Sequence, residues 1–155
     1  MKEPQRRPLA DMTLADASPV AAAMASQDAL TMSMVQDALD KRRLRLAYQP
    51  VVMASDTNRI GFYEGLIRVL DETGRAIPAR DFMGAVETTE TGRQIDCAAL
   101  EIGLATLHQQ PGLRLSINMS ARSVGYPRWT RILRRALAAH PDIGQRLILE
   151  ITESS

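Results

Sequence analysis

Three polar side chains that could bind a cation each lie inside a strand-like run of apolar residues. They are Glu64 within residues 61–68, Asn118 within residues 113–120 and Glu150 within residues 146–154. Burying a carboxylate among apolar residues is costly unless a cation or a hydrogen-bond donor meets it. Carboxylate and amide oxygens are the donors that a hard divalent cation takes. The sequence therefore predicts that three strands bring these groups together around one cation.

Each of these residues also has a simpler interpretation when it is considered alone. An isolated glutamate such as Glu64 is usually a surface or strand-edge acid, and Asn118 by itself is typical of a turn or a strand ladder. Glu150 carries more weight, because apolar residues flank it on both sides and a buried charge has to be compensated. The predicted cation site therefore depends on whether the fold brings the three strands together.

The composition is that of an ordinary globular domain and argues against several classes of protein. The chain has 155 residues, of which 45% are hydrophobic, enough for one domain with a core. A formal net charge of +1 gives no sign of a DNA-binding protein. The single cysteine, Cys97, excludes a disulfide framework and a cysteine-based zinc site. No run approaches the roughly 18 consecutive apolar residues of a membrane span, so we expect a cytoplasmic protein.

The chain alternates between strand and helix patterns, which is typical of an α/β fold. Residues 1–32 are rich in Ala, Ser, Met and Pro and are predicted to form a flexible leader or linker, with the domain occupying residues 33–155. A helix is expected to begin at Ser33, where Gln36 completes the spacing of a capping box. The elements expected next are a hairpin of residues 44–52 and 61–68, helices 81–90 and 94–109, strand 113–120, helix 128–140 and strand 146–154. Strand–helix–strand units of this kind predict a parallel sheet.

The last predicted strand, residues 146–154, has no helix after it to cover it. A buried-type strand left at the edge of a sheet can pair with a strand of another chain. The sequence therefore predicts a homo-oligomer or a domain swap between copies of the chain.

Five short motifs occur in a fixed order along the chain. They are Tyr48-Gln49-Pro50-Val51-Val52, Glu64-Gly65-Leu66-Ile67-Arg68, Pro78-Ala79-Arg80-Asp81-Phe82, Asn118-Met119-Ser120 and Glu150-Ile151-Thr152-Glu153-Ser154. Their types, order and spacing over roughly residues 33–155 resemble those of EAL domains, which are cyclic-di-GMP-specific phosphodiesterases. The resemblance implies a partial, half TIM-type barrel of about four strands, with the first strand antiparallel to the rest and the helices outside.

The resemblance also implies roles for individual residues in metal-assisted hydrolysis of cyclic-di-GMP to linear pGpG. The matched ligands of Mg²⁺ or Mn²⁺ are Glu64, Asn118 and Glu150; the matched contacts of cyclic-di-GMP are Gln49, Leu66 and Arg68; and Glu153 matches a glutamate that anchors a neighbouring loop. For Arg68 an alternative stays open, because a guanidinium binds carboxylates as well as phosphates and Asp71 is close in sequence.

The sequence departs from the family pattern in two respects. Gly65 replaces the alanine of the signature tripeptide. The family's later aspartate pair, lysine, glutamate and glutamine have no counterparts, since no lysine follows Lys41 and the only aspartate after Asp96 is Asp142. We therefore expect the N-terminal half of an EAL domain, with no complete catalytic set, weak or absent metal binding and no hydrolysis by itself. The alternative is a non-catalytic EAL-like module that acts by binding, by oligomerisation or through a protein partner.

Overall fold

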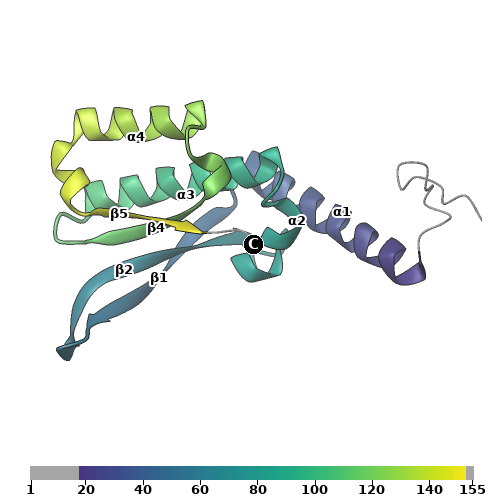
Figure 1. Ribbon diagram of the computed structural model, residues 1–155, viewed down its shortest axis with the longest axis horizontal. Helices are drawn as coiled ribbons and strands as arrows, with labels where there is room; N and C mark the ends of the chain where they lie inside the picture. The colour runs from purple at the N-terminus through teal and green to yellow at the C-terminus, as the bar shows by residue number, and fades with distance from the viewer. Residues whose placement is uncertain (1–17, 153–155) are drawn as a thin grey trace, which may run out of the picture.

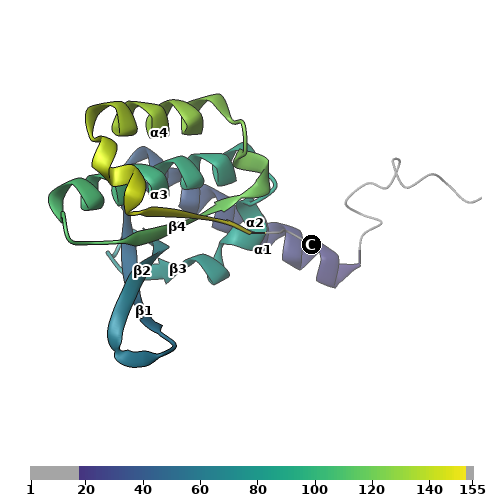
Figure 2. The same ribbon diagram turned by 60° about the vertical axis from the view of Figure 1, so that its left-hand side comes forward.

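One open, mixed sheet forms the framework of the molecule. The computed structural model describes residues 18–152 of the chain. The main path of the sheet runs β1–β2–β4–β5 (Figure 1), and a short strand, β3, pairs with β2 off this path (Figure 2). The strands are β1 (Leu44–Met53), β2 (Asp56–Leu70), β3 (Ala76–Pro78), β4 (Leu115–Ser120) and β5 (Leu147–Thr152). Within the described residues the sheet does not close, as expected for part of a TIM-type barrel.

The directions of the strands follow the prediction from the sequence. β1 and β2 form an antiparallel hairpin, whereas β2, β4 and β5 run parallel to one another. The hairpin contains a bulge near Val51 and Val52, just after Pro50, which cannot donate a hydrogen bond to the ladder. The first strand is therefore antiparallel to β2, β4 and β5, as the resemblance implied, and the short strand β3 is also antiparallel to β2.

Two helices form successive layers over one face of the sheet. α3 (Glu90–Gln109) packs on β4, and α4 (Pro127–Ala139) lies beyond α3 (Figures 1 and 2). The strict alternation of β4 turns Leu115, Ile117 and Met119 toward the helices, where all three are buried. They share a core with apolar residues of α3 and with Trp129 of α4. Because the apolar side chains of β4 pack against the helices, the alternate side chains of β4, including Asn118, lie on the uncovered side of the sheet.

The first helix, α1 (Pro19–Asp40), begins earlier than expected. Its N-cap is Ser18, whose Oγ accepts a hydrogen bond from the backbone N–H of Ala21 at 3.2 Å, and Pro19 takes the first helical position. The expected start at Ser33 is therefore wrong, and residues 19–32, assigned to a flexible leader, are helical because Ala and Met favour a helix once a cap is present. Residues 1–17 of the expected leader lie outside the described residues.

Only the second half of α1 packs on the domain. Val35 and Ala38 are buried against Val69 of β2 and Phe82, and Arg43 donates a hydrogen bond from Nη1 to the carbonyl of Leu70 at 3.0 Å. The first half of the helix projects away from the sheet (Figure 1). α1 is thus joined to the domain at one end only.

The region between β2 and α3 also differs from the expectation. The residues expected to form one helix from Asp81 to Glu90 instead form a 3-10 helix (Ala79–Asp81) and a single turn, α2 (Met83–Val86). Gly92 lies in the first turn of α3, where a Cβ would stand 2.6 Å from the carbonyl oxygen of Val86. Glycine therefore permits a close approach of α2 to α3. None of the helices in residues 18–152 is both long and apolar enough to cross a membrane.

Candidate metal and ligand site

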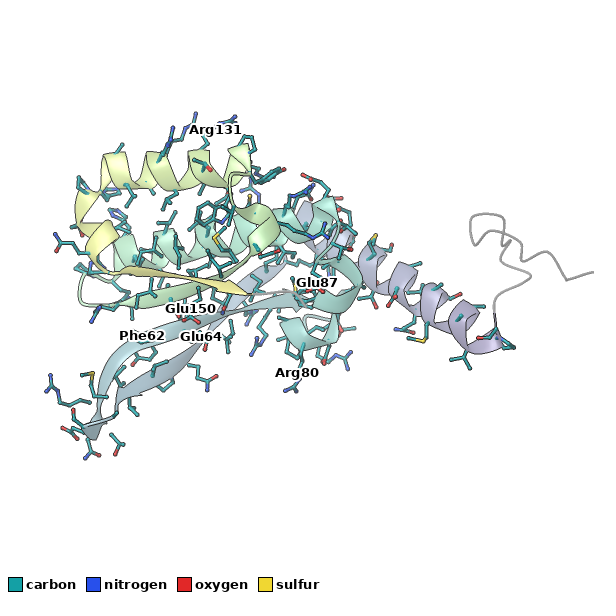
Figure 3. The ribbon with its side chains drawn as sticks, in the orientation of Figure 1. Phe62, Glu64, Arg80, Glu87, Arg131 and Glu150 are labelled. Atoms are coloured by element: carbon teal, nitrogen blue, oxygen red, sulfur yellow. The ribbon has the colours of Figure 1, made fainter. Side chains whose placement is uncertain are left out.

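The three predicted metal ligands lie on one face of the sheet. Asn118 of β4 is in direct register with Glu150 of β5, so their side chains project from the same side. The Nδ2 of Asn118 donates a hydrogen bond to Oε1 of Glu64, on β2, at 2.8 Å. Figure 3 shows Glu64 and Glu150 on the side of the sheet away from α3 and α4. The fold therefore brings together the three side chains singled out in the sequence.

This donor set fits a hard divalent cation in kind. It consists of two carboxylates and one amide, and within residues 18–152 neither Glu64 nor Glu150 forms an ion pair with a lysine or arginine. No cluster of three or more His, Cys, Asp or Glu side chains occurs in the described part of the chain, so a cation here needs the amide oxygen of Asn118. Mg²⁺ takes six oxygen ligands, of which these residues supply one each when they bind through one atom.

The predicted ligand contacts are placed on the same two strands. Gln49 of β1 is paired with Glu64 across the hairpin, and Leu66 and Arg68 follow Glu64 at two-residue steps, which puts all of them on one face. The Nη1 of Arg68 donates to the backbone carbonyl of Ile67 at 3.1 Å and, more weakly, to that of Leu66 at 3.4 Å. Arg68 does not form the alternative ion pair with Asp71 in the structure. Asp71 instead pairs with Arg75 at 3.3 Å. Glu153 lies outside the described residues.

A cavity of about 380 Å³ opens beside these residues. The parallel pairing of β2 and β4 extends only as far as Gly65 and Ile117, and beyond that point the two strands separate. The polar side chains that line the cavity are Arg80, Glu87, Asp96, Asn118 and Ser120, and Leu66 adds an apolar wall. The cavity therefore lies toward the C-terminal ends of parallel strands, where TIM-type barrels carry their binding sites.

Asp96 is a buried carboxylate whose function the sequence did not reveal. Its Oδ2 accepts hydrogen bonds from the backbone N–H of Ser120 at 3.0 Å and from the Oγ of Ser123 at 2.6 Å. Burial raises the pKa of Asp96, although the two hydrogen bonds oppose this rise. Asp96 thereby fixes the end of β4, two residues beyond Asn118. Its position between Ile95 and Cys97 in the predicted helix 94–109 was the signal that could have identified it.

A second group of contacts holds the loop that follows β4 from its other side. The hydroxyl of Tyr126 donates to Oε1 of Glu90, and Arg93 pairs with Glu90 at 3.0 Å while lying over the Tyr126 ring. These interactions lower the pKa of Glu90, with the hydrogen bond from Tyr126 as the largest cause. The N-terminal part of α3 thus positions the segment that follows β4, through Asp96 on one side and Glu90 on the other. Arg80 belongs to one of the five motifs of the sequence but was not assigned a role there, and Glu87 carried no sequence signal that pointed to the cavity.

Comparison with known proteins supports the fold and the family. The family model of the EAL domain matches residues 32–155. The EAL domain of FimX from Xanthomonas citri, solved in complex with c-diGMP, has a TM-score of 0.70 at 22% identity, over 84% of this chain and 52% of that one. An EAL domain protein from Listeria monocytogenes has a TM-score of 0.65 at 26% identity, over 79% of this chain and 49% of that one.

The extent of the match is also informative. The EAL domain of FimX from Pseudomonas aeruginosa, bound to c-di-GMP, has a TM-score of 0.63 at 25% identity, over 78% of this chain and 49% of that one. The chain thus spans about half the length of these solved structures. No curated protein sequence matches it. Because the family model covers residues 32–155, well over half of the sequence, the chain belongs to the EAL domain family.

Proposed function

We propose that the uncovered face of the sheet binds cyclic-di-GMP together with a Mg²⁺ or Mn²⁺ ion. The observation that carries this proposal is the convergence of Glu64, Asn118 and Glu150 from three neighbouring strands. Two EAL domain structures of FimX and the structure of the PaMucR phosphodiesterase, which resemble the chain, contain c-di-GMP. The proposed reaction of the complete domain is hydrolysis of cyclic-di-GMP to pGpG in the cytoplasm.

Different residues of this face would bind the cation and the dinucleotide. Glu64, Asn118 and Glu150 would hold the ion through oxygen atoms, and the bound ion would supply charge stabilisation for the phosphodiester and activation of water. Gln49 and Leu66 would contact the dinucleotide beside the ion. The guanidinium of Arg68 is oriented by the carbonyl of Ile67, which favours a bidentate contact with a phosphate through its remaining N–H groups.

We further propose that the chain, taken by itself, binds without hydrolysing. The described residues offer three oxygen-donor side chains to a cation that takes about six ligands. The 155 residues contain no lysine beyond Lys41 that could assist a water molecule. Metal binding by the isolated chain is therefore expected to be weak.

Titration calorimetry tests the binding proposal directly. Cyclic-di-GMP should bind the chain more tightly with Mg²⁺ or Mn²⁺ present, and Arg68→Ala should remove most of this affinity. Arg59→Ala is the matched control, because Arg59 is exposed near the turn of the hairpin, at the end of β2 opposite to Arg68. No binding of cyclic-di-GMP with either ion would overturn the proposal.

Chromatography of the reaction products tests the second part. The chain alone should release no pGpG from cyclic-di-GMP. Release of pGpG that Glu64→Gln abolishes would show that three donors suffice for hydrolysis, and the proposal of an inactive chain would be wrong.

A second candidate function is a non-catalytic module that acts through association. It is favoured by the free edges of β1 and β5 within the described residues, and by Leu149 and Ile151, which are 37% and 57% exposed on the face of β5 that the helices cover elsewhere. A homo-oligomer or domain swap would bury these residues. Sedimentation should then show an assembly that Ile151→Lys weakens, whereas a compact monomer at high concentration would contradict association.

A further inference from the structure

The outer face of α4 is strongly cationic. The helix carries Arg128, Arg131, Arg134 and Arg135 and contains no acid. All four arginines are exposed, and Figure 3 shows Arg131 pointing away from the body of the protein. The opposite face of the helix, which includes Trp129, Ile132 and Leu133, packs into the core. The helix is therefore fixed in orientation by its apolar face, and its arginines cannot turn inward.

Most of this positive charge is not compensated within the described part of the chain. Arg128 lies 3.8 Å from Glu101 of α3, which is at the limit of an ion pair. Among residues 18–152, no carboxylate forms an ion pair with Arg131, Arg134 or Arg135. A solvated face usually mixes both signs of charge, which reduces self-repulsion. Three like charges on one side of a short helix instead provide electrostatic complementarity to an anionic partner.

The three arginines surround a recess of about 390 Å³. Gly125, Pro127 and Thr130 complete its lining, at the end of α4 that follows the loop from β4. Because a guanidinium presents a planar fork of donors, it binds the oxygens of a phosphate in pairs. Val124, which precedes this recess in the chain, is 59% exposed. The recess thus combines donors for phosphate oxygens with an apolar side chain beside it.

These features favour a membrane surface over a protein or a single-stranded nucleic acid. Protein interfaces are enriched in arginine together with aromatic residues and methionine, and single-stranded nucleic acids stack on aromatic side chains. The outer face of α4 offers no exposed aromatic residue and no methionine, because the aromatic residue of this helix, Trp129, is buried in the core. A row of arginines next to one exposed apolar residue suits contact with anionic headgroups.

We propose that the arginine face of α4, defined by Arg128, Arg131, Arg134 and Arg135, docks on the phosphate groups of an anionic lipid surface. Val124 rests against the boundary between headgroups and acyl chains in this arrangement. The candidate metal site lies on the other side of the sheet from α3 and α4, so it stays accessible when the arginine face is occupied.

Vesicle sedimentation with the whole chain tests this inference. The chain should sediment with vesicles that contain phosphatidylglycerol and not with vesicles of phosphatidylcholine alone, and added salt should weaken the binding. Since each arginine near an anionic surface contributes roughly a fivefold increase in affinity, the combined change of Arg131, Arg134 and Arg135 to Gln should weaken binding about a hundredfold. Val124→Ser should weaken it less.

A matched control separates this face from net charge. Changing Arg59, Arg75 and Arg114 to Gln removes the same charge from exposed positions outside α4 and should leave most of the binding intact. Circular dichroism checks that both triple variants remain folded. Equal weakening by the two variants, or no binding to anionic vesicles, would overturn the inference. Saturation of the chain by inorganic phosphate, with release from vesicles, would assign the recess to a soluble phosphate compound instead.

Discussion

Asn118 and Glu64, separated by 54 residues in sequence, are joined by a hydrogen bond of 2.8 Å between Nδ2 and Oε1. The bond links β4 to β2 on the uncovered face of the sheet, directly beside Glu150 in the register of β5. Because Nδ2 is engaged, the Oδ1 of Asn118 is the atom that would face a cation. The amide therefore positions one carboxylate while it offers an oxygen of its own.

Asn118→Ala tests this double role. We expect the affinity for Mn²⁺ to fall by at least about tenfold, because the variant loses one oxygen donor and the group that orients Glu64. Electron paramagnetic resonance of free Mn²⁺ measures this affinity. Asp56→Asn, on the exposed turn of the hairpin, removes a charge without touching the site and should leave the affinity unchanged. Equal Mn²⁺ binding by Asn118→Ala and the unaltered chain would contradict a role for the amide.

Gly103→Ala should destabilise the fold through the core of the sheet. A Cβ at this position of α3 would lie 2.6 Å from Cδ1 and 2.9 Å from Cγ1 of Ile117. Overpacking of this kind costs about 1–3 kcal/mol in the free energy of unfolding. Urea denaturation measures the loss, and Gly112→Ala, which meets nothing within 4 Å, is the control for the change itself.

The same clash can be relieved from its other side. Ile117→Val removes Cδ1, so Gly103→Ala should cost less in that background than in the unaltered chain. Gly65 approaches the same atom, with a Cβ that would stand 3.0 Å from it. An equal cost of Gly103→Ala in both backgrounds would show that Ile117 is not the cause.

Asp96→Asn should change how stability depends on pH. Burial raises the pKa of Asp96 above the ordinary value of 3.8, so the folded chain retains this proton to a higher pH than the unfolded chain does. The stability contributed by the proton is therefore complete below the unfolded pKa and is lost as the pH rises through the folded pKa. Asparagine cannot ionise, and its Oδ1 can replace Oδ2 as acceptor for Ser120 and Ser123.

Urea midpoints measured from acidic to neutral pH check this prediction. The unaltered chain should lose stability relative to Asp96→Asn as the pH rises above 3.8. Asp28→Asn, on the exposed half of α1, serves as the control and should follow the unaltered chain. A difference between Asp96→Asn and the unaltered chain that stays constant with pH would show that ionisation of Asp96 does not affect folding.

Cys97 should react slowly with thiol reagents. It is fully buried on α3, and burial raises the pKa of its thiol to about 11. At pH 8 roughly one thiol in a thousand is then ionised, and the thiolate is the reactive form. Labelling followed by mass spectrometry should be slow in buffer and rapid in denaturant. A cysteine introduced as Ser26→Cys on the exposed half of α1 provides the comparison, and similar rates at both positions would refute the assignment.

Sequence reasoning succeeded where local periodicity is strong. Apolar and polar residues alternate strictly along residues 113–120, a strand pattern, and in the structure Ile117 and Asn118 lie on opposite faces of β4. It failed at elements that depend on distant partners. β3 has three residues and exists only because it pairs with β2, and the start of α1 depends on a cap at Ser18 that lies before the expected helix. The hydrogen bond from the backbone N–H of Ser120 to Asp96 joins residues 24 positions apart, and no local sequence pattern predicts such a contact.

The sequence by itself determined which side of each strand carries the polar groups, because successive side chains of a pleated strand point to opposite faces. Only the tertiary structure decided that Glu64, Asn118 and Glu150 meet. Their meeting depends on the register of β2, β4 and β5, and β4 also packs on α3, where Gly103 lies close to Ile117. Register between separate strands arises from such long-range packing, which the order of residues along one strand does not specify.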